Sequence, residues 1–233
     1  MNEPLMIGTR GWEHAAWTGG FYPPELPDDW RFCYYSNHLR SVLVPQAAWA
    51  AATRAAVAQW VTDSDPAFRF VLEVPAALSA PQNHGDRDRG VEAFLETVEP
   101  IAPRTAGLLL RVAPDTPVLL DWFERLLSRL DETAPVCVDL AENEWRDEPV
   151  LEALARQGAG LAWHCAHEPA PRPGGRLLVA LGPAAAAREV RRWVEQLAQW
   201  RTPGAAAGLF FDAPESAAKA AQEARIIAEL MGV

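Results

Sequence analysis

The sequence predicts an α/β fold in which short apolar strands alternate with longer helices. Several strand candidates are almost continuously apolar, which is typical of parallel strands covered on both faces. The eight candidates are residues 5–9, 41–46, 68–75, 106–113, 134–140, 158–165, 175–182 and 206–213. About eight repeated strand–helix units favour a closed barrel, because parallel neighbours need helical crossovers and closure removes both exposed sheet edges.

Helical patterns occupy most of the intervals between these strands. They cover residues 23–38, 45–61, 89–101, 115–132, 147–157, 184–200 and 214–231. Leu119, Phe123 and Leu126 have the spacing of three or four that gives a helix one apolar face, continued by Leu127 and Leu130. After the sixth strand, PAPRPGG leaves no room for a helix. We therefore predict a TIM-like (β/α)8 barrel with a weak or missing helix after the sixth strand.

The alternative is an open, doubly wound sheet. That fold would need a phosphate-binding G-x-G-x-x-G turn after the first strand, and GTRGWEH does not supply it. The 233 residues show no glycine- or serine-rich linker, and 49% are hydrophobic, so we expect a single domain over residues 1–233.

The charge balance disfavours nucleic acid as a partner. Lysine and arginine number 21 against 31 aspartates and glutamates, which gives a net charge of −10. A phosphate-backbone binder needs a basic face. The one arginine cluster, at 188, 191 and 192, lies beside glutamates at helical spacing and is typical of a solvated face. We expect a small-molecule ligand as the partner, and the oligomeric state stays open.

The cysteines and the apolar segments bear on localisation. Cys33, Cys137 and Cys165 are far apart and form no C-x-x-C motif, which fits a reducing compartment. No segment approaches the roughly 20 apolar residues of a membrane span, and the amino terminus lacks a leader pattern. We expect a cytoplasmic protein without membrane contact.

A glycine- and aromatic-rich segment follows the first strand. GTRGW and WTGGFYP resemble the amino-terminal signature of the YecE-like family (domain of unknown function 72), in which G-T-x-G-W precedes W-x-G-x-F-Y-P. The matching residues are Gly8, Thr9, Gly11, Trp12, Trp17, Gly19, Phe21, Tyr22 and Pro23. The resemblance implies a TIM-barrel fold and an uncharacterised protein.

The chain departs from the family pattern at polar positions. VLVPQAAW at 42–49 stands where the family has V-E-I-N-S-T-F-Y, so Leu43 replaces a carboxylate. Leu181 occupies the place of the histidine in R-L-H-G, and Glu73 and Arg111 stand where lysine and glutamine are usual. The resemblance thus implies a divergent member whose usual polar site is largely lost.

Side chains at the carboxyl ends of barrel strands converge on one mouth. The ligand-binding candidates there are Arg10, Trp12, His14, Tyr22, Gln46, Arg111 and His164. Arg10 could form a fork to a carboxylate or phosphate, and Trp12 and Tyr22 could stack on a planar or sugar-like ligand. The alternative interpretation is that the aromatic residues of this loop close the mouth by packing.

Three carboxylates on separate strand ends are candidate catalytic residues. Glu73, Asp139 and Asp212 could supply an acid/base pair of the kind that barrel glycoside hydrolases use, or Arg111 could neutralise one of them in an ion pair. We favour a binding module or pseudo-enzyme for a small anionic or sugar-like ligand, because apolar groups replace polar ones at two family positions. The alternative is a hydrolase or isomerase that uses Glu73, Arg111, Asp139 and Asp212.

A metal site is the weaker interpretation of the sequence HCAHE. His164 and His167 could join Asp139 or Glu168 around an ion. The two histidines are three residues apart across a strand end rather than on a helix, so we assign no metal ligand. No G-x-S-x-G elbow, Walker loop, H-E-x-x-H motif or dinucleotide fingerprint occurs, and the cofactor stays unknown.

Overall fold

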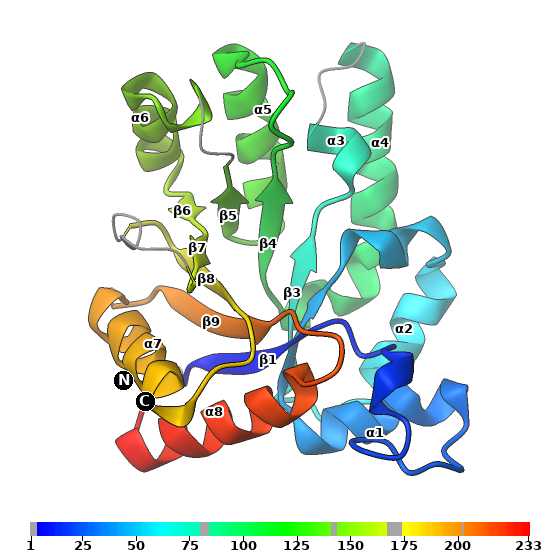
Figure 1. Cartoon of the computed structure of the whole chain (residues 1–233). Coiled ribbons are helices and arrows are strands. Elements are labelled where there is room, and N and C mark those ends of the chain that lie inside the picture. The colour runs from blue at the N-terminus through cyan, green and yellow to red at the C-terminus, as the bar shows by residue number, and fades with distance from the viewer. Residues whose placement is uncertain (1–3, 80–83, 141–143, 167–173, 202) are drawn as a thin grey trace.

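The protein forms a barrel of parallel strands surrounded by helices (Figure 1). The structure is a computed structural model that describes residues 4–79, 84–140, 144–166, 174–201 and 203–233. Nine strands make one sheet in the order β6-β5-β4-β3-β2-β1-β9-β8-β7. They are β1 Met6–Arg10, β2 Ser41–Val44, β3 Arg69–Glu73, β4 Thr105–Arg111, β5 Val136–Asp139, β6 Gly160–Leu161, β7 Trp163–His164, β8 Leu177–Gly182 and β9 Ala206–Phe211.

The sixth strand of the barrel is split into β6 and β7. Only Ala162 separates the two pieces, β6 pairs with β5, and β7 pairs with β8. The two ends of the nine-stranded sheet are therefore neighbours in the chain, and the ring closes through residues 160–164. At the start of this segment the backbone runs so close to β8 that a Cβ on Gly160 would collide with the carbonyl of Leu177. The strand predicted at 158–165 is thus present, with a break that the sequence pattern did not indicate.

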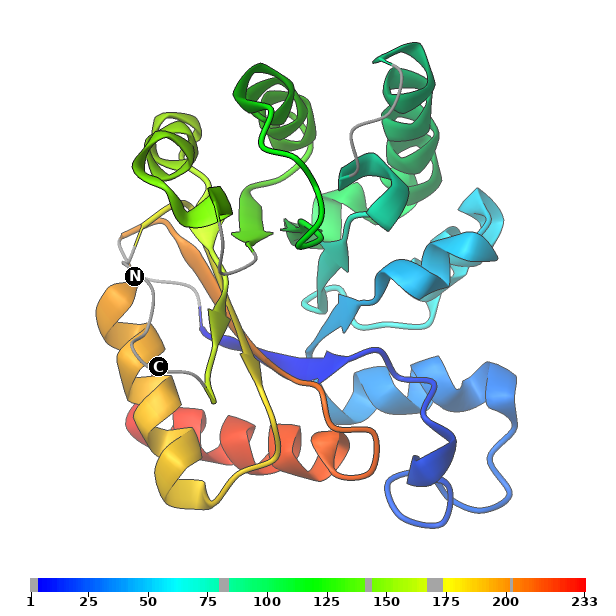
Figure 2. The same cartoon turned by 45° about the horizontal axis from the view of Figure 1, so that its top comes forward.

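The helices cover the outside of the ring, as Figure 2 shows from a second direction. They are α1 Arg31–His38, α2 Arg54–Thr62, α3 Ala76–Ser79, α4 His84–Val98, α5 Leu120–Asp131, α6 Glu148–Gln157, α7 Ala187–Trp200 and α8 Ala217–Met231. Between β7 and β8 the described residues, 165–166 and 174–176, contain no helix. Residues 167–173, on which the predicted missing helix depends, lie outside the described part of the chain. Among the described residues, no helix has both the length and the apolar character needed to cross a membrane.

Three helix predictions need correction. The helix predicted at 23–38 is a 3-10 helix at Asp28–Trp30 followed by α1 from Arg31. The single helix predicted at 45–61 is a 3-10 helix at Gln46–Ala50 followed by α2, which begins at Arg54 because the Thr53 side chain accepts a hydrogen bond from the Ala56 amide at 3.2 Å. This N-cap starts a new helix where alanine content alone predicted a continuous one. Leu119 is half exposed, because α5 begins one residue later, although the rest of the predicted apolar face is buried.

Apolar side chains fill both the barrel interior and the layer between strands and helices. The interior cluster consists of Met6, Leu43, Val71, Leu109, Cys137, Ala162, Leu177, Val179, Leu181 and Phe210. The larger outer cluster joins the other strand faces to the helices. Burial in the interior raises the pKa of the Cys137 thiol to about 12. The lower and middle parts of the barrel are thus a packed core, which leaves the strand ends to carry polar groups.

One buried tyrosine ties the first helix to the first two strands. The Tyr35 hydroxyl donates to the carbonyl oxygen of Ser41 at 2.9 Å and accepts from the amide of Thr9 at 3.1 Å. Tyr35 is fully buried, and burial raises the pKa of its hydroxyl. Because β1 and β2 both depend on this contact, it fixes the start of the loop that follows β1.

Candidate functional site

Six polar side chains meet at the carboxyl end of the barrel, and we call them the mouth residues. They are Arg10, Glu73, Arg111, Asp139, His164 and Asp212. Strand side chains alternate between faces, so a residue two positions after an interior residue faces the same way. Val71, Leu109 and Cys137 belong to the interior cluster, and a mouth residue follows each of them two positions later. The mouth residues therefore form the layer directly above the apolar interior.

Glu73 is the centre of the mouth. Its carboxylate accepts two hydrogen bonds from Arg10, Nε to Oε1 at 2.5 Å and Nη2 to Oε2 at 2.9 Å. Arg111 Nη2 lies 3.3 Å from Oε1, and the backbone amide of Gln46 donates to Oε2 at 3.0 Å. The Glu73 side chain is fully buried, and Trp49 Nε1 donates to its backbone carbonyl at 2.6 Å. This carboxylate is fixed by partners from three other elements.

The ion pairs continue outward from Glu73 in both directions. On one side, Arg10 Nη1 lies 3.5 Å from Asp212 Oδ2. On the other side, Arg111 Nε lies 3.6 Å from Asp139 Oδ2, and His164 Nε2 lies 2.8 Å from Asp139 Oδ1. The mouth residues thus form a chain in which carboxylates and guanidiniums alternate from Asp212 through Arg10, Glu73 and Arg111 to Asp139, and His164 ends it. The pKa of Arg10 is raised, chiefly by its hydrogen bond to Glu73 and against the effect of burial.

Exposure is greatest at the two ends of this chain. The Asp212 and His164 side chains are 41% and 39% exposed, whereas Asp139 is 13% exposed. Arg10 and Arg111 are intermediate at 24% and 29%. A molecule that approaches the mouth therefore reaches both carboxylate and guanidinium groups, and Glu73 lies beneath them.

The family model described as "Protein of unknown function DUF72" matches residues 6–233 of the chain. The chain belongs to the DUF72 family. This confirms the resemblance to YecE-like proteins (domain of unknown function 72). No curated protein is similar enough to the chain to count as a match.

Solved structures of other DUF72 family proteins resemble this DUF72 chain along nearly its whole length. The one from Thermotoga maritima has a TM-score of 0.77 at 15% identity, over 97% of this chain and 99% of that chain. One from Enterococcus faecalis has a TM-score of 0.73 at 16% identity, over 98% and 96%. D-psicose 3-epimerase from Clostridium cellulolyticum, solved with D-tagatose, has a TM-score of 0.58 at 7% identity, over 98% of each chain. At these identities the likeness shows the fold alone, which is the predicted TIM-like barrel.

Two leucines of this DUF72 chain, which the resemblance matches to polar family positions, fill the barrel interior. Leu43 and Leu181 are both buried and both belong to the interior cluster. They extend the apolar filling of the barrel up to the layer beneath the mouth. The mouth residues consequently stand on an apolar floor, which strengthens the electrostatic interactions among them.

The aromatic loop of this DUF72 protein is packed into the core. Trp12 and Tyr22 are buried at 6% and 1% exposure. The Trp12 ring contacts Phe32 and Trp60 at centroid distances of 4.8 and 5.0 Å, and the Tyr22 hydroxyl donates to the Trp12 carbonyl at 2.6 Å. Both rings already have protein partners on their faces or edges. The burial therefore favours the packing interpretation of this loop over ligand stacking by Trp12 and Tyr22.

Two further candidates each make one contact with a mouth residue. His14 Nε2 is 3.0 Å from the carbonyl of Arg10, and its ring packs on Trp17 at 4.5 Å. Gln46 contributes its backbone amide to Glu73, as described above. Both residues thus support the positions of mouth residues, a role that the sequence pattern did not indicate.

The metal interpretation rests partly on residues outside the described part of the chain. His167 and Glu168 lie there, so the structure places only His164 and Asp139 of that set. Within the described residues, no group of three or more histidine, cysteine, aspartate or glutamate side chains is arranged to hold an ion. The assignment of no metal ligand stays a prediction.

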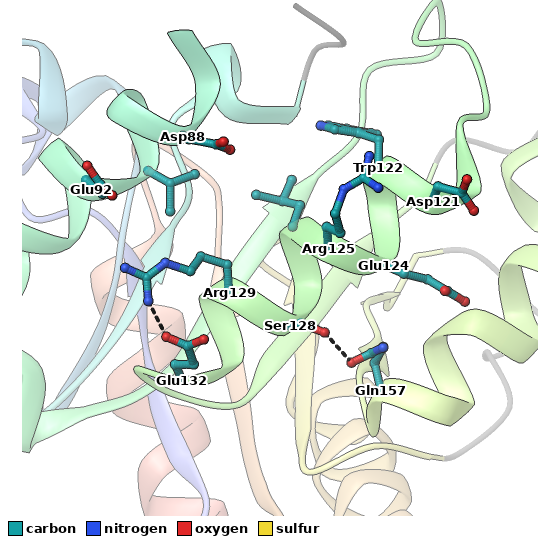
Figure 3. Close-up of a pocket in the computed structure, with 12 residues that line it drawn as sticks. Asp88, Glu92, Asp121, Trp122, Glu124, Arg125, Ser128, Arg129, Glu132 and Gln157 are labelled. Atoms are coloured by element: carbon teal, nitrogen blue, oxygen red, sulfur yellow. Dashed lines mark hydrogen bonds and ion pairs between the residues drawn. The ribbon is translucent and has the colours of Figure 1, made fainter. Parts of the chain in front are cut away.

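A large cavity of this DUF72 protein lies away from the mouth. It has a volume of about 730 Å³ and opens between α4 and α5 on the outside of the barrel (Figure 3). Charged side chains surround it, and Arg129 pairs with Glu132 at its rim. None of the predicted site residues lines it. It is a crevice in the helical layer, so it does not replace the mouth as the candidate site.

Proposed function

We propose that this DUF72 barrel binds a small polyhydroxylated, sugar-like ligand at its mouth. The observation that carries this proposal is the alternation of carboxylates and guanidiniums along the mouth residues. Hydroxyl groups both donate and accept hydrogen bonds, so a polyol matches a surface that offers both kinds of partner. The sequence left anionic and sugar-like ligands open. Three carboxylates against two guanidiniums support the neutral class, because an anion would meet repulsion from the carboxylates.

Glu73 acts in this proposal as an anchor rather than as a ligand contact. It is fully buried and its two oxygens are occupied by Arg10, Arg111 and the Gln46 amide. A bidentate guanidinium–carboxylate pair has a fixed geometry. Glu73 therefore orients both arginines before any ligand arrives, which lowers the entropic cost of binding.

The outer mouth residues are the proposed contact groups. Asp212 would accept hydrogen bonds from ligand hydroxyls, and Arg10 and Arg111 would donate to hydroxyl or carbonyl oxygens. Their side chains are the accessible ones in the ion-pair chain, together with His164. A ligand with neighbouring hydroxyls could bridge Asp212 and Arg10, whose charged atoms are 3.5 Å apart.

Tryptophan fluorescence provides the test, because Trp49 is hydrogen-bonded to the carbonyl of Glu73. D-tagatose and D-fructose are the neutral probes and citrate is the anionic one. We expect the fluorescence to change saturably with a sugar, with a Kd of about 1 mM or lower. Asp212→Asn should bind the sugar roughly tenfold more weakly, because it loses a charged hydrogen-bond acceptor. Glu195→Gln, which removes an exposed carboxylate on α7, is the matched control and should bind as the unchanged protein does. Binding of citrate alone would refute the ligand class, and sugar binding indifferent to Asp212→Asn would refute its location.

Proton transfer is a second candidate function, and one specific contact favours it. His164 Nε2 lies 2.8 Å from Asp139 Oδ1, and the histidine is the more exposed of the two. An imidazole oriented by a carboxylate is an arrangement that general acid–base catalysis uses. Of the carboxylates predicted as catalytic, Glu73 suits this role least because both of its oxygens are occupied by Arg10, Arg111 and the Gln46 amide.

Exchange of carbon-bound hydrogen distinguishes catalysis from simple binding. In deuterated water, an isomerase-type base would incorporate deuterium next to the carbonyl of D-fructose or D-tagatose, which proton NMR detects. The second function predicts incorporation that His164→Gln abolishes while sugar binding persists. Sugar binding without any incorporation would support the binding module and refute the catalytic alternative.

We propose that the protein acts in a reducing, cytoplasmic environment. Its three cysteines are free, and Cys137 and Cys165 are buried. The net charge of −10 supports the expectation that nucleic acid is not the partner.

A further inference from the structure

A second cavity lies at the opposite end of the barrel from the mouth. It has a volume of about 460 Å³. Met6, Ser41 and Arg69, the first residues of β1, β2 and β3, line it together with the carboxyl-terminal part of α8. This volume falls within the range of about 300–1,000 Å³ that small-molecule sites occupy. The amino-terminal end of such barrels normally serves stability, so polar groups there need their own explanation.

The lining of this amino-terminal cavity is positively charged, although the protein carries a net charge of −10. Arg40, Arg69 and Arg225 line it, and Glu229 is the one acidic side chain among the lining residues. Arg225 Nη1 pairs with Glu229 at 3.2 Å, so no further carboxylate side chain of the lining is left for Arg40 and Arg69. Arg69 Nη1 donates to the carbonyls of Pro66 and Phe68, so backbone contacts hold its guanidinium in place.

Two buried polar atoms of the same lining have no hydrogen-bond partner within the described residues. They are Ser41 Oγ and Arg225 Nε. Ser41 is 2% exposed, so solvent does not replace the missing partner. Buried polar groups in folded proteins are normally hydrogen-bonded, and each exception calls for an explanation such as an unseen ligand. Both residues line the cavity, and a hydroxyl and a guanidinium Nε–H can each donate to an acceptor there.

The rest of the lining is apolar and defines the other half of the ligand. It consists of Pro4, Leu5, Met6, Ile7, Ala67, Ala228 and Val233. We propose that the amino-terminal end of the barrel carries a second binding site, for a small organic anion with a carboxylate or phosphate head and an apolar body. The head contacts Ser41 Oγ and the arginines, and the body lies against the apolar residues. This site is independent of the ligand proposed for the mouth.

Isothermal titration calorimetry with octanoate tests the proposal, and 1-octanol is the uncharged comparison. We expect octanoate to bind with a Kd of about 1 mM or lower and octanol to bind at least tenfold more weakly. Octyl phosphate tests whether a phosphate head is accepted in place of a carboxylate. Ser41→Ala and Arg225→Gln should each weaken octanoate binding about tenfold, because each removes a hydrogen bond to a charged group. Arg191→Gln is the matched control, since Arg191 also pairs with a glutamate four residues later but lies on α7 outside the cavity lining.

An unfolding measurement on Ser41→Ala and a binding measurement on a variant of the mouth complete the test. The free energy of unfolding of Ser41→Ala should match that of the unchanged protein, because the hydroxyl has no partner to lose. Weaker octanoate binding by this variant would then report on the site rather than on folding. Equal binding of octanol and octanoate, or octanoate binding indifferent to both Ser41→Ala and Arg225→Gln, overturns the proposal. Loss of octanoate binding in Asp212→Asn would place the anion at the mouth and overturn it as well.

Discussion

Replacing Glu73 with glutamine removes the charge that two guanidiniums share. Breaking a buried ion pair by removing one partner costs about 3–5 kcal/mol. The lower end applies here, because Arg10 and Arg111 are 24% and 29% exposed and keep Asp212 and Asp139 as weaker partners. Glutamine also keeps one acceptor oxygen. We expect Glu73→Gln to lower the free energy of unfolding by about 3 kcal/mol, which corresponds to a decrease in Tm of about 6–12 °C for a chain of this size.

Urea denaturation followed by circular dichroism measures this loss, and calorimetry gives the change in Tm. Glu195→Gln is the control, because its partner Arg191 is exposed and such pairs contribute less than about 1 kcal/mol. A double-mutant cycle with Arg10→Gln should give a coupling energy of about 1–3 kcal/mol, since the two side chains form a bidentate contact. A loss below about 1 kcal/mol for Glu73→Gln, or no coupling to Arg10, would refute the role of Glu73 as the anchor of the mouth.

Four further outcomes follow from the packing of the barrel. Tyr35→Phe should lower the free energy of unfolding by about 1–3 kcal/mol, because it leaves a buried carbonyl and a buried amide without their hydroxyl partner. Urea denaturation measures this change, and an unchanged midpoint would contradict it. Gly160→Ala should lower the free energy of unfolding by about 3 kcal/mol or prevent folding, since the added Cβ would collide with the carbonyl of Leu177. A thermal melt by circular dichroism like that of the unchanged protein would show that the strands are farther apart. The pKa of the Cys137 thiol is about 12 in the folded protein against an ordinary value of 9.0, so between these pH values the folded protein keeps a proton that the unfolded chain loses. The free energy of unfolding should therefore decrease from about pH 9 to pH 12. This decrease should be smaller in Cys137→Ala. At about pH 8, a thiol reagent should modify Cys33 in the folded protein and Cys137 only after unfolding.

The strand–helix rhythm was sufficient to predict the barrel because each element depends on local patterns. Continuous apolar runs indicate buried parallel strands, and the spacing of apolar residues indicates helices that pack on them. The exceptions also have local causes. Thr53 caps a new helix inside the segment predicted as one, and the backbone contact of Gly160 with β8 accompanies the break at Ala162.

The mouth could be predicted only as a set of residues. Arg10, Glu73, Arg111, Asp139 and Asp212 were all expected at strand ends, but the sequence did not separate them from Trp12 and Tyr22, which the structure buries in the core. What the pattern could not supply was the pairing. Whether Arg111 contacts Glu73, Asp139 or both depends on the distance between side chains of different strands, which no spacing along the chain records.

By itself, the sequence determined the barrel architecture, the family and the polar character of the strand ends, because hydrophobic periodicity and local motifs are properties of short segments. Only the tertiary structure decided that the charges at the mouth join into one chain around a buried Glu73 and that the aromatic loop is buried. It also decided that Ser41 and three arginines share a cavity at the other end. The physical reason is that ring closure brings residues separated by tens or hundreds of positions within hydrogen-bonding distance, and the energy of such contacts depends on burial and geometry rather than on order along the chain.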